Sequence, residues 1–264
     1  MTRTPHHSYA RYVAIGDSQT EGLGDGDDTH GHRGWADRLA EVLAAGHPDF
    51  TYANLAVRGR RTAGIKAEQL GPALALKPDL VTVMAGMNDL VRPGFDAGLV
   101  VADIEEMFAE LTAAGAHVAT VTFPDLGRIS PLARRALPRV LDLNARIRAA
   151  ADRHGVTVLD TFSHRLTTDP RLWSGDRLHA SPLGHARIAA GMAGALGVIG
   201  RDDWLSPLPP LAPVSVLGAA TAEARWFAGF LGPWVWRRIR GRSSGDGRAA
   251  KRPELEPVVP WDRA

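Results

Sequence analysis

The sequence predicts an α/β protein in which a parallel β-sheet carries helices on both faces. Three observations lead to this fold class. Short apolar runs alternate with longer segments of helical periodicity, five of each. Several helical segments stop at glycine, the usual residue just past a helix C-terminus, as in AAGHP, AAGAH and RHGV. The 264 residues suffice for one sizeable core with an extension.

The expected elements follow in strict order along the chain. Apolar, β-branched and aromatic residues dominate the runs that we predict as strands. These strands are residues 12–15, 51–55, 80–85, 117–123 and 157–159. The segments of helical periodicity are residues 34–45, 62–74, 99–114, 137–154 and 183–196. Ligand sites of such sheets lie beyond the carboxyl ends of the strands, so the residues after each strand are the candidates for function.

Composition narrows the class of protein. Hydrophobic residues make up 45% of the chain and charged residues 23%, which is ordinary for a soluble globular protein. The absence of cysteine excludes disulfides, thiolate metal sites and a cysteine nucleophile. No window approaches the roughly 18 apolar residues of a membrane span. The first fifteen residues lack the apolar stretch of a signal peptide, so we expect a soluble cytoplasmic protein.

The basic residues are concentrated toward the C-terminus. Residues 205–264 hold nine Lys and Arg against five Asp and Glu, a net charge of +4, whereas the rest of the chain has a net charge of −2. A nucleic-acid enzyme usually carries its positive surface on the folded domain. We therefore expect no nucleic-acid partner.

The character of the sequence changes beyond Trp204. SPLPPLAPVS is a proline-rich linker that cannot be helical throughout. An aromatic and basic segment, the Gly/Ser-rich SSGDGR and the polar KRPELEPVV follow it. We predict one folded domain over residues 1–204, and a linker with an aromatic and basic extension over residues 205–264.

The extension contains an aromatic stripe with helical spacing. Its members share one face of a helix that a proline at 233 would kink: Trp226, Phe227, Phe230, Leu231 and Trp234. This face could pack on the folded body of the chain or mediate self-association. Together with the arginines up to residue 242, it could instead form a peripheral membrane anchor over residues 226–242, or it could cover a pocket in the folded body. The sequence leaves these interpretations open.

Polar residues follow the expected strands at one rim of the sheet. Each has a structural explanation by itself: a helix cap for Ser18, a turn for Gly59, an Asx-turn for Asn88 and a surface ion pair for Asp176 with His179. Their joint occurrence after successive strands favours a catalytic site, because together they supply every group that a serine hydrolase needs.

Four motifs carry a resemblance to a known family. The chain resembles the SGNH hydrolases, also known as the GDSL esterase/lipase family, in the blocks GDSQTEG, NLAVRGRRT, GMND and DRLHASPLGH. These blocks and the strands between them span residues 12–196. The resemblance implies a three-layer α/β/α sandwich around a five-stranded parallel sheet, of flavodoxin-like type.

The resemblance also implies a role for each matching residue. Ser18 matches the nucleophile, while Asp176 and His179 match the acid and the base of a catalytic triad. The oxyanion hole would consist of the backbone N–H groups of Ser18 and Gly59 and the side-chain amide of Asn88.

These residue types suit ester hydrolysis. Serine is a weak nucleophile until a base takes its proton, and an imidazole can accept that proton and return it to the leaving group. A carboxylate that accepts a hydrogen bond from the other ring nitrogen of the histidine fixes the tautomer of the imidazole. Asp176 and His179 are three residues apart, so one short loop can present both. His185, the rival base, lies in a predicted helix and is interpreted as structural, and Asp17 is expected to brace the turn before Ser18.

The departures from the family pattern are small. Gln19 stands where the motif name expects leucine, and Ala56 where the second block often has glycine; neither is expected to touch the reacting atoms. The arginines at 58, 60 and 61 are either solvated charges or selectors of an anionic or polar acyl ester. The polar, glycine-rich segment 21–34 is interpreted as a flap over the serine, and we expect no metal.

The sequence thus predicts a serine esterase that acts on small-molecule, lipid or carbohydrate esters through an acyl-enzyme, with no cofactor. An acyltransferase, a thioesterase or a lysophospholipase would use the same residues. A non-catalytic module that acts through its aromatic tail is the alternative from another class. Acyl length, the alcohol part and the oligomeric state are not encoded in these motifs.

Overall fold

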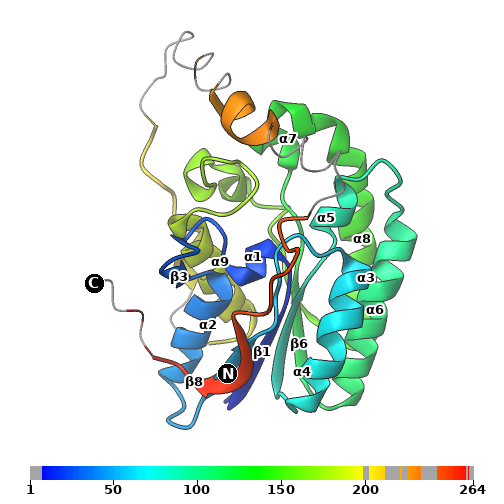
Figure 1. Cartoon of the computed structure of the whole chain (residues 1–264), viewed down its shortest axis with the longest axis vertical. Coiled ribbons are helices and arrows are strands. Elements are labelled where there is room, and N and C mark those ends of the chain that lie inside the picture. Colours follow the sequence, from blue (N-terminus) through cyan, green and yellow to red (C-terminus); the bar gives the residue numbers. More distant parts are fainter. Residues whose placement is uncertain are drawn as a thin grey trace, which may run out of the picture.

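The computed structural model describes residues 8–198, 202–211, 221, 225–232, 243–259 and 261. The described residues form one main sheet of six strands in the order β7-β6-β5-β1-β4-β8 (Figure 1). Neighbouring strands of the first five are parallel, whereas β8 runs antiparallel to β4. The strands are β1 (Arg11–Gly16), β4 (Thr51–Asn54), β5 (Leu80–Met84), β6 (His117–Val121), β7 (Thr157–Leu159) and β8 (Arg252–Pro257).

The α/β fold class is confirmed, but the expected number of strands is wrong. The sixth strand, β8, comes from the C-terminal extension and pairs with β4 at the edge of the sheet. Its sequence, RPELEP, has two prolines and a charged residue at every second position, and most of its side chains are exposed. Proline is tolerated on edge strands, where one row of backbone groups needs no partner. This strand therefore lacks the apolar run that identifies the other five.

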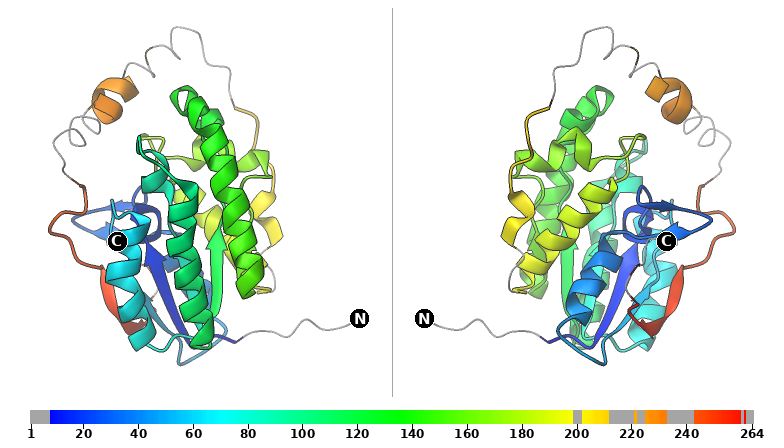
Figure 2. Two further views of the ribbon diagram at one scale, coloured as in Figure 1. Left: turned by 90° about the vertical axis from the view of Figure 1, so that its right-hand side faces the viewer. Right: turned by 90° about the vertical axis from the view of Figure 1, so that its left-hand side faces the viewer.

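Helices cover both faces of the sheet (Figures 1 and 2). On one face lie α2 (Trp35–Ala44) and α9 (Pro182–Ala195), which pack against each other. On the other lie α3 (Thr62–Ile65), α4 (Gly71–Ala75), α6 (Ala97–Ala113) and α8 (Leu137–His154). A π-helical turn, η1 (Lys66–Leu70), joins α3 to α4, so the single helix expected over 62–74 contains an irregular turn. Across the described ranges, every helix is too short or too polar to cross a lipid bilayer.

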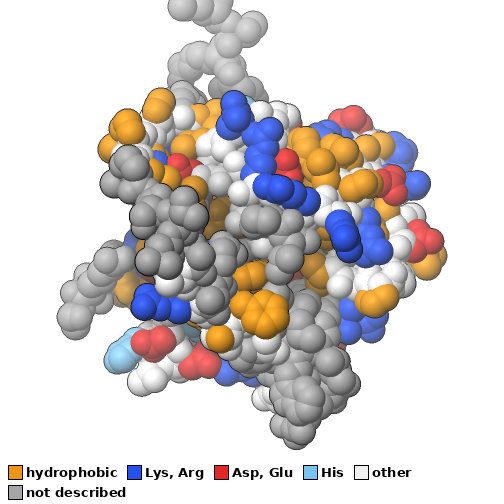
Figure 3. Space-filling view, turned by 90° about the horizontal axis from the view of Figure 1, so that it is seen from above, with side chains coloured by type: hydrophobic (Ala, Val, Ile, Leu, Met, Phe, Trp, Pro, Cys, Tyr) orange, Lys and Arg blue, Asp and Glu red, His pale blue; other side chains and the backbone are white. Residues whose placement is uncertain are grey.

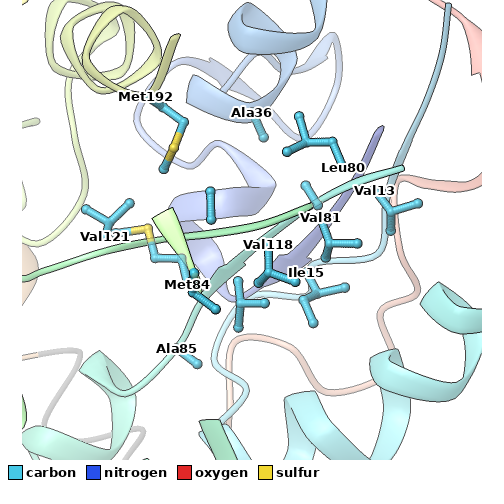
Figure 4. Close-up of a cluster of buried hydrophobic side chains, with 14 of the residues drawn as sticks. Val13, Ile15, Ala36, Leu80, Val81, Met84, Ala85, Val118, Val121 and Met192 are labelled. Carbon is cyan, nitrogen blue, oxygen red and sulfur yellow. The ribbon is translucent and has the colours of Figure 1, made fainter. Parts of the chain in front are cut away.

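The core lies between these layers. Val13, Ile15, Leu80, Val81 and Val118 are almost fully buried and project from adjacent strands (Figure 4). Such continuous apolar runs are expected for parallel strands, because helices cover them on both sides.

Short elements fill the connections. At the carboxyl ends of the strands lie α1 (Ser18–Glu21), α5 (Met87–Leu90), α7 (Leu126–Ile129) and the hairpin of β2 (Gly26–Asp27) with β3 (Gly31–His32). The remaining turns are η2 (Pro131–Ala136), η3 (Arg165–Thr168), η4 (Pro170–Leu172), η5 (Asp202–Leu205) and the π-helical η6 (Phe227–Leu231).

Candidate active site

Strand β1 ends in a tight turn that presents Ser18. A Cβ at Gly16 would lie 2.8 Å from the carbonyl oxygen of Met84, so only glycine fits there. The side-chain amide of Gln69 pairs with both backbone groups of Gly16, at 2.8 and 2.9 Å. Asp17 then caps α1, and Ser18 is the first residue of this helix and half-buried. The expected turn before the serine is therefore present.

One turn between η4 and α9 carries both Asp176 and His179. The Nδ1 atom of His179 lies 2.6 Å from Oδ2 of Asp176. The other carboxylate oxygen, Oδ1, accepts hydrogen bonds from the backbone N–H groups of Leu178 and His179 and from the Ser174 hydroxyl. When Nδ1 donates to a carboxylate, Nε2 is left as the proton acceptor of the neutral ring.

The carboxyl group of Asp176 is held in its ionised form. Burial by itself raises the pKa of Asp176, but the hydrogen bond and charge of His179 and the hydroxyl of Ser174 outweigh it. The pKa of this carboxyl therefore lies well below its usual range. A permanent negative charge beside Nδ1 is what a histidine base requires when it takes up a proton.

Gln19 ties the loop of His179 to the helix of Ser18. Its Nε2 donates to the carbonyl of Leu178 at 2.8 Å, and its Oε1 accepts from the N–H of Ala180 at 3.2 Å. These two groups flank His179 in the chain, and Gln19 follows Ser18 directly. The amide is buried, with 6% of the residue exposed. The position that departs from the family pattern thus connects the two halves of the site.

Asn88 and Gly59 lie at the same rim. The Asn88 amide donates to Oδ2 of Asp17 at 2.9 Å and to the carbonyl of Arg60 at 3.0 Å. Gly59 has φ +76°, a backbone conformation that side chains disfavour, in the turn between β4 and α3. Because the Asn88 amide already has these two acceptors, donation to a substrate oxygen requires it to exchange or share one of them.

Asp17 is a buried carboxylate directly before Ser18 in the chain. Only 3% of the residue is exposed, and Oδ1 accepts from the N–H of Gln19 at 3.2 Å. Burial raises the pKa of Asp17 to about 6, although the hydrogen bond from Gln19 and the charge of His179 act in the opposite direction. Asp17 braces the turn, as expected, and also orients Asn88.

A comparison with known protein families shows to which family the chain belongs. Residues 14–187 match the GDSL-like lipase/acylhydrolase family. The chain belongs to this family. It is therefore an enzyme of the SGNH ester hydrolase type. No curated protein sequence matches the chain.

Solved structures share the fold of this GDSL-type hydrolase. LAE5, an α/β hydrolase from the metagenome of Lake Arreo in Spain, superposes with a TM-score of 0.60 at 22% identity, over 72% of this chain and 96% of its own. A variant of Axe2, an acetyl-xylooligosaccharide esterase from Geobacillus, gives 0.58 at 21% identity, over 71% and 94%. TesA gives 0.57 at 24% identity, over 70% and 97%.

Arg58 of the GDSL-type hydrolase is not a solvated charge. Only 7% of the residue is exposed, and its guanidinium binds Glu21 and Asp28, at 2.5 and 2.9 Å. Its backbone N–H also donates to Glu21, at 2.6 Å. Arg60, by contrast, pairs at the surface with Glu68. Arg58 therefore fixes the loop before Gly59, because both its side chain and its backbone bind the same buried carboxylate.

His185 has the structural role that its place in a helix predicts. It is fully buried in α9, where its Nδ1 accepts from the N–H of Trp35 at 3.1 Å and its Nε2 lies 2.9 Å from the carbonyl of Leu23. Burial lowers the pKa of His185 to about 4, so the ring is neutral at physiological pH. Both ring nitrogens are engaged with backbone groups, which leaves this histidine no part in proton transfer.

An apolar cavity adjoins the site, and sequence reasoning did not identify it. Its walls come from β5, the loops after β6 and β7, and α9, and they include Gln19, Met84, Phe123, Trp173, Ala180 and Trp204. Seen from the carboxyl ends of the strands, hydrophobic side chains and Lys and Arg side chains share this end of the molecule (Figure 3). The lining residues are far apart in the sequence, so no local pattern marks them.

Asp17 makes stability depend on pH in a direction that can be tested. An acid whose pKa is raised on folding favours the folded state at low pH, and that stability is lost as the pH rises through about 6. Asp17→Asn is therefore expected to change the free energy of unfolding by roughly 1–3 kcal/mol more favourably at pH 8 than at pH 4, because the amide cannot ionise. Since one of the two N–H donors that Asp17 binds then loses its acceptor, the prediction concerns this difference between the two pH values. Urea unfolding at both pH values measures this. The exposed Asp152→Asn is the control, and equal changes at pH 4 and pH 8 would contradict the assignment.

Proposed function

We propose that this enzyme hydrolyses carboxylic esters through an acyl-enzyme intermediate on Ser18. The observation that carries the proposal is the 2.6 Å contact between Asp176 and His179, on a loop that Gln19 ties to the helix of Ser18. An ionised carboxylate, an oriented imidazole and a serine at a helix N-terminus are the groups that acyl transfer requires.

The proposed reaction has two stages. His179 Nε2 takes the proton of the Ser18 hydroxyl while Oγ bonds to the ester carbonyl carbon. The resulting oxyanion accepts hydrogen bonds from the N–H groups of Ser18 and Gly59 and from the Asn88 amide. When the C–O bond to the alcohol breaks, His179 returns the proton to the alcohol. Water then repeats the sequence on the acyl-enzyme, which releases the acid and restores Ser18.

The cavity beside Gln19 suggests where the acyl group lies. Its walls are almost entirely apolar, and Gln19 borders both the cavity and the helix of Ser18. We propose that the acyl chain of a small-molecule, lipid or carbohydrate ester rests against these walls while the alcohol part faces solvent. Transfer of the acyl group to another alcohol, or thioester hydrolysis, would use the same residues.

A panel of nitrophenyl esters from acetate to palmitate tests the proposal. We expect a rapid burst of about one equivalent of nitrophenolate per chain, followed by slower turnover as the acyl-enzyme hydrolyses. Adding a competing alcohol and analysing the products separates hydrolysis from acyl transfer. Absence of turnover across the whole panel, together with no burst, would count against the proposed reaction.

Gln19→Leu, which introduces the residue typical of the family, is expected to lower kcat by roughly 10- to 100-fold with little change in KM. The substitution removes both hydrogen bonds that flank His179, so the imidazole is less well placed to take the proton of Ser18. Steady-state kinetics with a short soluble ester measure the effect. A kcat equal to that of the unmodified enzyme would show that the two bonds do not position the base.

A further inference from the structure

We propose that two parts of the C-terminal extension, residues 225–232 and 243–257, are positioning elements of the active site. Trp226 holds the loop of Asp176 and His179, and residues 243–245 hold the loop of Gly59. The inference rests on the proposed function, because it assigns these contacts to the same catalytic groups. The match to the family ends at residue 187, so these contacts come from outside the matched region.

Trp226 is the point where the extension meets the acid–base loop. Its indole N–H donates to the backbone carbonyl of Asp176 at 2.8 Å. The guanidinium of Arg177 lies over the indole ring, 4.9 Å from its centroid. Trp226 is 8% exposed, whereas the adjacent Phe227 is 58% exposed. In the predicted aromatic stripe, therefore, Trp226 packs on the body and Phe227 does not, while the Trp234 position lies outside the described residues.

The geometry of this loop explains why it needs support. Arg177 has φ +58°, in the left-handed region that residues with a side chain disfavour. Such a backbone persists only when its surroundings hold it there. Trp226 contacts both the backbone carbonyl directly before Arg177 and the guanidinium of Arg177. Loss of the indole N–H thus frees the peptide that orients both Asp176 and His179.

The extension makes a second contact, with the loop of Arg58 and Gly59. A Cβ at Gly245 would overlap the carbonyl oxygen of Arg58, and a Cβ at Gly59 would overlap the hydroxyl of Ser243. The two backbones therefore meet directly, with glycine on both sides. Because the N–H of Gly59 is a proposed oxyanion donor, the segment 243–245 bears on the position of that donor.

The extension is fixed on the body just after this contact (Figure 1, red). Arg248 pairs with Asp28 at 2.6 Å. The Nζ of Lys251 donates to the carbonyl of Glu21 at 2.6 Å and to that of His32 at 2.8 Å. Strand β8 follows and pairs with β4. Because these contacts attach residues 248–257 to the body, they keep the preceding segment 243–245 against the loop of Arg58 and Gly59.

Trp226→Phe tests the first contact in the full-length chain, because phenylalanine still provides an aromatic ring but has no N–H donor. We expect kcat for a short soluble ester to fall about 3- to 10-fold with KM within twofold of the unmodified enzyme. The low-field ¹H NMR signal of the His179 Nδ1 proton should broaden or shift. Phe227→Ala, at an exposed neighbouring position, is the control and should change neither readout.

Gly245→Ala tests the second contact. The added Cβ overlaps a backbone oxygen, so the segment must move away from Arg58 and Gly59. We expect a similar fall in kcat, whereas the signal of the His179 proton should stay unchanged because that loop is untouched. Gly229→Ala is the matched control, since it adds the same methyl group within the extension where no atom lies within 4 Å.

The outcomes separate this inference from the proposed function. Folded Trp226→Phe and Gly245→Ala enzymes that keep kcat within twofold and an unaltered His179 signal would overturn the inference. If Gly245→Ala fails to fold, Trp226→Phe decides by both readouts. If the unmodified chain hydrolyses no ester but its His179 signal responds to Trp226→Phe, the proposed function fails and the positioning role of Trp226 stands.

Discussion

Replacing Ser18 by alanine is expected to lower kcat/KM for ester hydrolysis by roughly 10⁴- to 10⁶-fold. The proposed reaction begins with attack by the Ser18 hydroxyl, and no acyl-enzyme can form without it. The substitution removes one oxygen from a half-buried residue at a helix N-terminus, so the fold should persist. Ester hydrolysis and the thermal unfolding midpoint measure the two effects separately.

A serine outside the site provides the matched control. Ser206 is exposed and follows η5, so Ser206→Ala should keep full activity. The double variant Ser18→Ala/His179→Ala should be no worse than Ser18→Ala alone, because the nucleophile and its base act as a unit. Substantial activity in Ser18→Ala, or a further large loss in the double variant, would contradict this assignment.

Asp176→Asn is expected to lower kcat by about 10⁴-fold. The asparagine can keep the Oδ1 contacts to Ser174, Leu178 and His179 and turn its amide N–H₂ toward His179 Nδ1. Nδ1 must then accept a hydrogen bond, so the ring proton moves to Nε2. A protonated Nε2 cannot take the proton of Ser18. The geometry survives but the tautomer is wrong. Steady-state kinetics over a range of pH measure the loss.

Asp169→Asn is the control for this carboxylate. Asp169 lies seven positions earlier, caps η4 and pairs with Arg171, so it resembles Asp176 in its local bonds but not in its contact with a histidine. We expect Asp169→Asn to affect stability alone. A loss of kcat that is equal in both variants would assign the effect to the loop as a whole and not to the tautomer of His179.

Most of the fold follows from patterns that are local in the sequence. Apolar runs identified the five parallel strands, and β7 has the expected bounds of 157–159. Periodicity and a terminal glycine gave α8 its bounds of 137–154. The strand β8 was missed because an exposed edge strand needs no apolar pattern, and RPELEP instead shows proline and charge. Its position depends on pairing with β4, which lies about 200 residues away.

The candidate site also has a part that local sequence patterns predict and a part that depends on distant contacts. The residues of the motifs were predicted because they match the four blocks of the family, and because these blocks come after successive strands, at the rim that a parallel sheet creates. The contacts of Gln19 and Trp226 were not predicted, because each reaches a loop that is distant in the sequence, 159 residues away for Gln19 and Leu178. For Trp226, packing on the body was only one of the interpretations of the aromatic stripe. The departure of Gln19 from the family pattern was the only signal for its contact. The burial of Arg58 was equally hidden, since its partner Glu21 belongs to another motif.

Labelling with a fluorophosphonate, followed by peptide mass spectrometry, tests the central claim most directly. It reports which side chain is the activated nucleophile, independently of the natural substrate. The proposed site predicts one adduct per chain on Ser18, and a labelling rate that falls sharply in His179→Ala. An adduct on a different residue in an active enzyme, or equally fast labelling of Ser18 without His179, would contradict it.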